Sequence, residues 1–180
     1  VNYREAYNIF ACNGILFNHE SPLRGETFVT KKIISALCKI SLSGTGNLYL
    51  GNLYSKRDWG HAKDYVLAMW KMLQRKNPKD YVIASGRQYS VKYFVNLICD
   101  ILKIKIYWKG KGINEKAYWN GKVIISIDKK YFRPTEVDSL LGDSSKARKE
   151  LRWKPLYNIR SLAQDMVAEE FKKIHVNKKK

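Results

Sequence analysis

One short stretch, GILFNHESP, places a polar cluster directly after an apolar run. The cluster is Asn18, His19 and Glu20, and the apolar residues before it are typical of a strand buried in a parallel sheet. Ligands of open α/β sheets bind beyond the carboxyl ends of the strands, so amide, imidazole and carboxylate groups here could contact a bound molecule. A strand end capped by polar loop side chains shows the same pattern. For the cluster taken alone, that simpler interpretation is favoured.

Three further segments carry charged side chains that suit an anionic ligand. Arg57 stands in KRDWGHAKD just before a predicted helix, and Lys31 and Lys32 fall in the first half of another. Arg133 and Glu136 share the extended stretch YFRPTEVD. A guanidinium can bind phosphate oxygens through two parallel hydrogen bonds, and a carboxylate can accept them from ribose hydroxyls or a guanine edge. Each of these residues alone is more simply explained as part of a surface ion pair.

Tyrosine and lysine four residues apart can form an acid–base pair on one helix face, where the ammonium lowers the tyrosine pKa. Two such pairs occur, Tyr107 with Lys111 and Tyr118 with Lys122. In a chain so rich in tyrosine and lysine, about two such pairs are expected by chance. Each pair also contains a glycine and lies among strand and loop signals, which disfavours a helix. We therefore interpret both pairs as coincidental.

Metal ligation and disulfide bonding are not indicated by the histidines and cysteines. His19, His61 and His175 have no histidine or cysteine at ligand spacing, so we predict no metal site. The three cysteines are an odd number at unpatterned positions. This favours reduced, buried thiols in a cytoplasmic protein.

The chain of 180 residues carries a net charge of +18, which is typical of proteins that bind nucleic acids or other anions. Its lysines are spread along the whole length, and aromatic residues do not alternate with them as in single-strand binders. A small anionic molecule fits the charge as well as a nucleic acid, so we disfavour a nucleic-acid partner. No apolar run approaches the ~20 residues that cross a bilayer, so no membrane segment is predicted.

Strands alternate with helices along the chain, which predicts an α/β protein with parallel strands. Residues 1–7 are expected to end a helix. Strands are expected at residues 9–17, 47–53, 80–85, 105–108 and 123–127, and helices at residues 26–40, 61–76, 91–102, 143–151 and 161–173. The strand at residues 9–17 should be buried on both faces because it is mostly apolar.

Helix caps and buried faces follow from the same patterns. Ser90 is the predicted N-cap of one helix, and Asp143 or Ser144 that of another. In the helix at residues 61–76, helical spacing places Tyr65, Met69 and Met72 on the inward face.

A dinucleotide-binding sheet begins with a strand, a glycine-rich turn and a helix whose N-terminus binds the pyrophosphate. Here the first predicted element is the end of a helix, with no strand before it. GTGNLY and GKGINE lack the third glycine and the strand–turn–helix context. The sequence thus predicts the later elements of such a sheet without its phosphate-binding turn.

Taken together, four stretches resemble the GDP-mannose 4,6-dehydratase family, a group of extended short-chain dehydrogenases/reductases. They are YREAYNIFACNGILFNHESPLRGETFVTKKI, LYLGNLYSKRDWGHAKDYVLAMW, DYVIASGRQYSV and YFRPTEVDSLLGDSSKARKELRWKP. The resemblance covers residues 1–155 and is weakest in INEKAYWNGKVIISIDKK and in the lysine-rich tail. GILFNHESP, RDWGHAKDY and YFRPTEVD together separate this family from other sugar-nucleotide epimerases and dehydratases.

The resemblance implies a fold class. It is the C-terminal part of an α/β, NAD(P)-binding, Rossmann-like extended short-chain dehydrogenase/reductase, with the smaller α/β substrate-binding lobe. Residues 1–22 and 61–86 would form the last Rossmann elements, 23–60 and 87–174 the GDP-sugar lobe, and 175–180 a basic tail.

The implied reaction converts GDP-mannose to GDP-4-keto-6-deoxymannose, in the biosynthesis of GDP-fucose and related deoxyhexoses. Hydride leaves the mannose C4 for bound NADP, and the resulting 4-keto group acidifies the C5–H. Water is then lost across C5 and C6, and the hydride returns to C6. Because the cofactor is regenerated, the net reaction is that of a lyase.

The resemblance also assigns site residues by position. On the cofactor side the matching residues are Asn18, His19, Glu20 and Arg24. On the GDP-sugar side they are Asn18, Val29, Lys32, Leu50, Gly51, Arg57, Arg133 and Glu136. Leu23 departs from the family, which commonly has the first of two arginines there; the change would weaken a contact to the cofactor phosphate or to a neighbouring subunit.

The family's catalytic Thr or Ser, Glu and Tyr-x-x-x-Lys lie upstream of the first helix here, so the sequence assigns no catalytic residue. The expected partners are GDP-mannose and the missing N-terminal Rossmann half, in the same or a complementary chain. This chain alone is expected to be inactive, and complete members form homodimers or homotetramers. The alternatives are a non-catalytic GDP-sugar-binding module and, less favoured, a basic nucleic-acid-binding protein.

Overall fold

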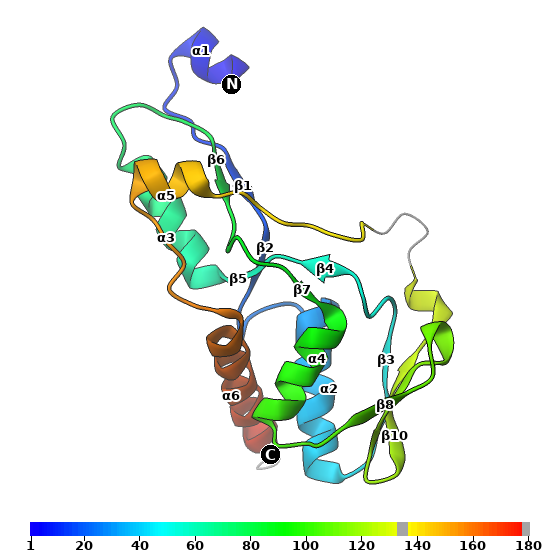
Figure 1. Cartoon of the computed structure of the whole chain (residues 1–180). Coiled ribbons are helices and arrows are strands. Elements are labelled where there is room, and N and C mark those ends of the chain that lie inside the picture. The colour runs from blue at the N-terminus through cyan, green and yellow to red at the C-terminus, as the bar shows by residue number, and fades with distance from the viewer. Residues whose placement is uncertain (133–136, 178–180) are drawn as a thin grey trace.

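The computed structural model describes residues 1–132 and 137–177. They form an upper and a lower region, joined by short strands in the middle of the molecule (Figure 1). The upper region consists of α1 (Asn2–Tyr7), β1 (Gly14–Leu16), α3 (Ala62–Leu73), β6 (Tyr81–Ile83) and α5 (Ser145–Leu151). The lower region consists of α2 (Val29–Ser43), β3 (Leu48–Leu50), α4 (Val91–Ile101), β8 (Tyr107–Lys109), β9 (Lys116–Trp119), β10 (Lys122–Ile127) and α6 (Ile159–Asn177), with the 3₁₀ turns η1 (Gly112–Asn114) and η2 (Lys129–Tyr131). Between them lie β2 (Asn18–Glu20), β4 (Lys56–Arg57), β5 (Trp59–His61) and β7 (Tyr89–Ser90).

The upper region is held by a small apolar core between α3, β6 and α5. Strands β1 and β6 are parallel, with Gly14 opposite Tyr81. Tyr81 packs in one cluster with the buried rings of Tyr65 and Trp153 and with Ala147 of α5. Helix α5 therefore packs with the upper region, although it falls within residues 87–174. The division into two lobes drawn from the sequence stays a prediction.

The expectation that the first strand is buried on both faces is wrong. Leu16 packs into the upper core, but Ile15 is 56% exposed and Ile9 and Phe10 are exposed as well. Successive side chains of a strand point to opposite faces. Within the described ranges β1 pairs with β6 alone, and the face that carries Ile15 is uncovered.

The chain passes from the upper region into the middle through Phe17, whose N–H donates to the Ile83 carbonyl at 3.0 Å. It continues directly as β2, which leaves β6 and pairs in parallel with β5, His19 lying opposite Gly60. Strands β4 and β7 form a separate antiparallel pair, with Arg57 opposite Tyr89. GILFNHESP is therefore one extended segment that contributes a strand to each of two sheets. It pairs in parallel in both, through β1 with β6 and through β2 with β5.

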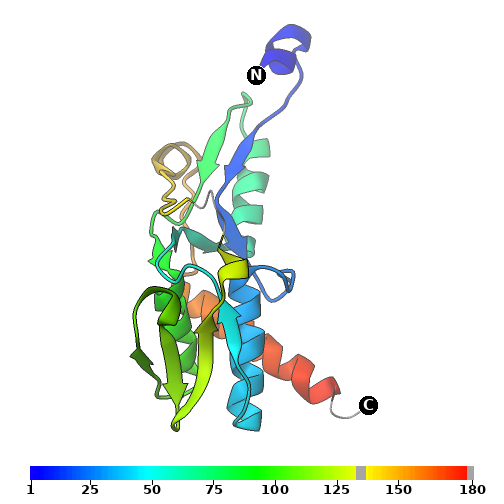
Figure 2. The same ribbon diagram turned by 90° about the vertical axis from the view of Figure 1, so that its right-hand side faces the viewer.

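The lower region packs three helices against a four-stranded sheet. Helices α2, α4 and α6 contact one another and enclose the larger apolar core, which includes Ile33, Phe94 and Met166. The sheet has the order β3-β10-β9-β8 and lies along α2, as Figure 2 shows. The predicted cap of α4 is confirmed, because Ser90 Oγ accepts a hydrogen bond from the Tyr93 N–H. No described helix is both long and apolar enough to span a bilayer.

Several local predictions differ from the structure. Strand β9 was not expected; it forms the middle of the hairpins that turn at η1 and at Gly121. Met69 faces outward at 39% exposure, whereas Tyr65 and Met72 are buried as predicted. The predicted start of α5 is confirmed, because Ser144 is its N-cap residue; Ser144 Oγ donates to the Ala84 carbonyl, and it is Asp143 that accepts from the Ser145 N–H.

A buried carboxylate, Asp58, joins the strands at the middle of the molecule. Its Oδ1 accepts from Ser85 N at 2.9 Å and from Ser85 Oγ at 2.6 Å. Its Oδ2 accepts from Gly86 N at 2.9 Å and from Gly142 N at 3.3 Å. One side chain thus fixes both the loop after β6 and the segment before α5 to the β4–β5 junction.

We expect Asp58→Ala to lower the free energy of unfolding by about 3 kcal/mol, because it leaves buried donors without an acceptor. The measurement is urea denaturation. Asp100→Ala is the control: Asp100 pairs with Arg160 on the surface and should change stability by less than about 1 kcal/mol. Equal losses in the two variants would contradict a special role for Asp58.

Candidate functional site

The polar cluster Asn18, His19 and Glu20, which forms β2, is partly accessible. Asn18 and His19 are half-buried. His19 Nδ1 lies 2.9 Å from the Phe17 carbonyl, which can only accept, so this ring nitrogen donates. The ring also packs 5.2 Å from that of Tyr65 on α3. With Nδ1 occupied, Nε2 of the neutral imidazole remains as an acceptor for another group.

Glu20 is turned into the protein rather than toward a ligand. Its side chain is 2% exposed, and its Oε2 accepts a 2.6 Å hydrogen bond from Thr30 Oγ1. Burial raises the pKa of this carboxyl group, against the opposing effects of the Thr30 hydrogen bond and the Arg24 charge. Glu20 therefore ties the end of β2 to the first turn of α2, and only its backbone remains for a ligand.

Arg24 lies between Glu20 and an aromatic ring. Its Nε is 3.1 Å from Glu20 Oε2, and its guanidinium carbon lies 3.4 Å from the centre of the Phe28 ring. This Nε is buried and makes no hydrogen bond to any described residue. Because this Nε is buried against the Glu20 carboxylate, any contact of Arg24 with a bound molecule must use the other guanidinium nitrogens.

A second group of predicted residues meets where α2 approaches the end of β3. Lys32 Nζ donates to the Tyr49 carbonyl at 2.6 Å and lies 3.6 Å from the centre of the Tyr131 ring. Tyr131 belongs to η2, and its carbonyl oxygen crosses Gly51 so closely that a Cβ there would lie 2.4 Å away. Glycine at position 51 is therefore required by this approach of two backbone segments.

The apolar members of the predicted set frame this second group. Leu50 is buried, and its carbonyl accepts from Asp128 N at 2.9 Å. Val29 begins α2 and is half-buried. Both side chains pack in the lower apolar core. Because the Leu50 side chain is buried there, any contact of Leu50 with a ligand must use its backbone.

Arg57 lies at the end of β4, beside the segment that returns toward α5. Its Nη1 donates to the Lys56 carbonyl at 2.9 Å and to the Val137 carbonyl at 2.6 Å. The two remaining predicted residues, Arg133 and Glu136, lie outside the described residues. The structure thus shows Arg57 bonded to the chain just beyond them.

Helix α2 links the two groups through successive residues of its first turn. Thr30 binds Glu20 at the end of β2, and Lys32 binds Tyr49 in β3. Lys31, between them, is buried and pairs with Glu170 of α6 at 2.6 Å. Lys31 was a candidate for anion binding together with Lys32. Its ammonium instead forms a buried ion pair with Glu170, so it is not available to a ligand.

Asp58, Thr30 and Tyr131 position the site, but the sequence carries no signal that identifies them. Asp58 was visible only as a neighbour of Arg57, and its four donors come from distant segments. Tyr131 lies in a 3₁₀ turn that gave no sequence signal. Thr30 lies in the first turn of a helix, where threonine is common. Its position in the sequence therefore does not predict the hydrogen bond to Glu20.

The two Tyr-x-x-x-Lys matches do not lie on helix faces, as predicted. Tyr107 is in β8 and Tyr118 in the neighbouring β9, and their rings stack 5.3 Å apart. His61, which was expected to bind no metal, donates through Nε2 to Asp165 at 3.0 Å, because its Nδ1 already accepts from Lys63 N. Among the described residues no group of three or more His, Cys, Asp or Glu could hold a metal ion.

Comparison with known families gives a match over residues 1–166 to the family described as GDP-mannose 4,6 dehydratase. The chain belongs to this family. A Drosophila melanogaster GDP-mannose 4,6 dehydratase is 54% identical over 98% of this chain and 45% of the relative. A Sinorhizobium fredii enzyme of the same name is 54% identical over 94% of this chain and 49% of its own length. The chain therefore spans about half the length of the curated relatives it matches.

Solved structures confirm the expected fold class. RMD from Pseudomonas aeruginosa complexed with NADPH superposes with a TM-score of 0.76 at 15% identity, covering 94% of this chain and 50% of that chain. A dTDP-glucose 4,6-dehydratase from Bacillus anthracis in complex with NAD gives 0.74 at 17% identity, covering 97% and 49%. At these identities the likeness shows the fold alone. The assignment of this chain to its family rests on the family match over residues 1–166 and on the sequence relatives.

The close crossing at Gly51 predicts the effect of the smallest substitution. Gly51→Ala places a Cβ against the Tyr131 carbonyl and should lower the free energy of unfolding by about 1–3 kcal/mol. Urea denaturation measures it. In the control Gly25→Ala, the new Cβ meets only the Phe28 ring at 3.4 Å, an ordinary contact. A Gly51→Ala protein as stable as the Gly25→Ala control would show that η2 does not cross β3 this closely.

The raised pKa of Glu20 predicts a pH dependence of stability. Its contribution is complete below the ordinary pKa of 4.5 and is lost as the pH rises through the higher folded-state pKa. Glu20→Gln keeps an acceptor for Thr30 and does not titrate, so it should remove this decline. The free energy of unfolding of both proteins is measured from about pH 4 to about pH 7. If the difference in the free energy of unfolding between the two proteins stays constant over this pH interval, the pKa of Glu20 is not raised by folding.

Proposed function

We propose that this chain provides the GDP-sugar-binding part of a GDP-mannose 4,6-dehydratase, which converts GDP-mannose to GDP-4-keto-6-deoxymannose. The observation that carries the proposal is the family match over residues 1–166. A Cricetulus griseus GDP-mannose 4,6 dehydratase, 51% identical over 98% of this chain, supports it. The buried free thiols Cys38 and Cys99 suit the cytoplasm, where thiols stay reduced.

The residues assigned to the GDP-sugar side suit a diphosphate and a ribose. Lys32 and Arg57 are cations for phosphate oxygens, although each already donates to one or more backbone carbonyls. Leu50 and Gly51 offer backbone groups at the end of β3, and Val29 offers an apolar wall. Arg133 and Glu136, whose placement is not described, are proposed for the ribose or the base.

The residues at the end of β2 fit a nicotinamide cofactor. Arg24 is a partly exposed cation just beyond β2, and Asn18 and His19 are half-buried, so a bound molecule can reach all three. We propose that these residues and the Glu20 backbone contact NADP, which supplies reversible hydride transfer when bound. The chain's own contribution is to hold the His19 ring through Phe17 and Tyr65 and to place Arg24 at the strand end. The net reaction is that of an NADP-dependent lyase.

The proposed partner of this chain is the N-terminal Rossmann half of the family, in the same or a complementary chain. Strand β1 pairs only with β6 in the described part of the molecule, so one of its edges is open. Helix α3 also exposes an apolar stripe at helical spacing, which consists of Val66, Met69, Trp70 and Leu73. A strand against β1 and a helix against α3 would cover both surfaces. The complete protein is proposed to be a homodimer or homotetramer, and this chain alone to be inactive.

Calorimetry with GDP tests the proposed binding site. We expect the chain to bind GDP and Arg57→Gln to weaken that binding about tenfold, because a charge-assisted hydrogen bond to phosphate is lost. Arg75→Gln removes the same charge from an exposed position in the turn after α3 and should leave the affinity unchanged. The absence of heat with GDP would refute the site.

Turnover is tested separately, by mixing the chain with a separately expressed N-terminal half and following GDP-mannose by mass spectrometry. Formation of a product that has lost one water supports the dehydratase. GDP binding without product, although the halves associate, would favour the alternative of a non-catalytic GDP-sugar-binding module.

A further inference from the structure

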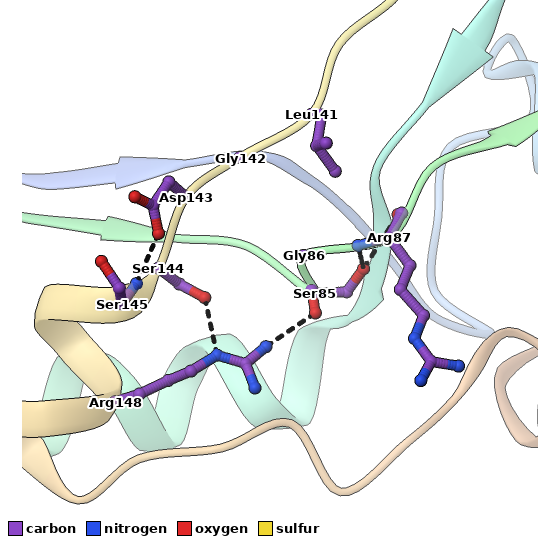
Figure 3. Close-up of a pocket in the computed structure, with 9 residues that line it drawn as sticks. All are labelled: Ser85, Gly86, Arg87, Leu141, Gly142, Asp143, Ser144, Ser145 and Arg148. Atoms are coloured by element: carbon purple, nitrogen blue, oxygen red, sulfur yellow. Dashed lines mark hydrogen bonds between the residues drawn. The ribbon is translucent and has the colours of Figure 1, made fainter.

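Two adjoining cavities lie where the loop after β6 meets α5 and the segment before α6. The first, of about 500 Å³, is formed by the loop at Ser85–Arg87 and the segment 141–145 together with Arg148 (Figure 3). The second, of about 300 Å³, lies between the same loop and residues 154–159. The two cavities share Ser85, Arg87 and Arg148 and together have the size of a site for a small organic molecule.

The shared wall carries two cationic side chains, Arg87 and Arg148. Arg148 is held in place by donating from Nε to Ser144 Oγ at 3.1 Å and from Nη2 to the Ser85 carbonyl at 2.8 Å. The Arg87 side chain extends away from these groups in Figure 3 and makes no hydrogen bond or ion pair with any described residue. Lys154 adds a third cation to the second cavity.

The carboxylates near these cations are not placed to neutralise the second cavity. Asp143 lines only the first cavity, where its carboxylate accepts from Ser145 N. Asp58, beneath the loop, is buried and already accepts from Ser85, Gly86 and Gly142. Among the residues that line the second cavity, three are cationic and none is acidic.

The loop that presents Arg87 is rigidly held. Ser85 Oγ donates to Asp58 and accepts from Arg87 N at 3.2 Å, and Gly86 N is bound by the same carboxylate. The remaining residues that line the second cavity are mostly aromatic or apolar, among them Tyr89, Tyr157 and Pro155, and Asn158 adds a polar amide. Sites for small ligands commonly combine apolar contacts with a few charged groups, and this cavity offers both.

We propose that this second cavity is an anion site that binds the phosphate group of a small phosphate ester. Arg87 supplies forked donors to the phosphate oxygens, Arg148 adds its positive charge and the N–H groups that do not bind Ser144 and Ser85, and Lys154 adds a point charge. Tyr89, Tyr157 and Pro155 pack against the organic part of the ligand. The cavity shares no lining residue with the proposed GDP-sugar and cofactor residues, so it is a site additional to theirs.

The site is tested by titrating the 180-residue chain with inorganic pyrophosphate at low salt, monitored by calorimetry. We expect saturable binding, and Arg87→Gln should weaken it about tenfold because one forked donor is lost. Arg75→Gln makes the same change of charge outside the cavity and should bind as the unchanged protein does. Thermal melting confirms that both variants are folded, as expected for exposed side chains.

GDP separates this site from the one proposed above. Arg57→Gln should weaken GDP binding and leave pyrophosphate binding to the Arg87 cavity intact, whereas Arg87→Gln should do the reverse. The proposal is overturned if pyrophosphate does not bind, if Arg87→Gln and Arg75→Gln weaken it equally, or if Arg57→Gln alone abolishes it. Loss of GDP binding in Arg87→Gln would also overturn it, because the two sites would then be one.

Discussion

The interaction on which the rest of the structure depends is the set of hydrogen bonds to the Asp58 carboxylate. Two backbone N–H groups of the loop after β6, one from Gly142 and the Ser85 hydroxyl all converge on it. These donors come from segments far apart in the chain. Because a buried carboxylate is stable only when its oxygens are satisfied, β4, β6 and the segment before α5 must keep these relative positions.

Helix α2 supplies the second constraint. Three consecutive residues of its first turn each bind a different part of the molecule. Thr30 fixes the end of β2 through Glu20, Lys31 anchors the helix to α6 through Glu170, and Lys32 reaches β3 through the Tyr49 carbonyl. The residues assigned to the cofactor and to the GDP-sugar therefore lie at the two ends of one short rigid segment. A substitution in this turn would disturb both proposed sites together.

Much of the fold could be predicted from the sequence because its signals are local. Ser90 caps α4, the strand expected at residues 80–85 contains β6, and the α/β class follows from the alternation of strands and helices. Errors arose where a neighbour decides the outcome. Ile15 has the residue type of a buried strand position but is exposed, and Met69 has helical spacing but faces outward. Strand β9 is stabilised by pairing on both sides, which its own composition does not indicate.

The sequence by itself determined the family and the types of residue at the proposed sites, since both reside in contiguous motifs such as GILFNHESP and RDWGHAKDY. Only the tertiary structure decided what these residues are free to do. Glu20 binds Thr30 and Lys31 binds Glu170, whereas Arg87, which lies in DYVIASGRQYSV but was assigned no role there, lines a cavity with Arg148. The physical reason is that a side chain's availability depends on which partner lies within hydrogen-bond distance. In this chain those partners are ten to well over a hundred residues away.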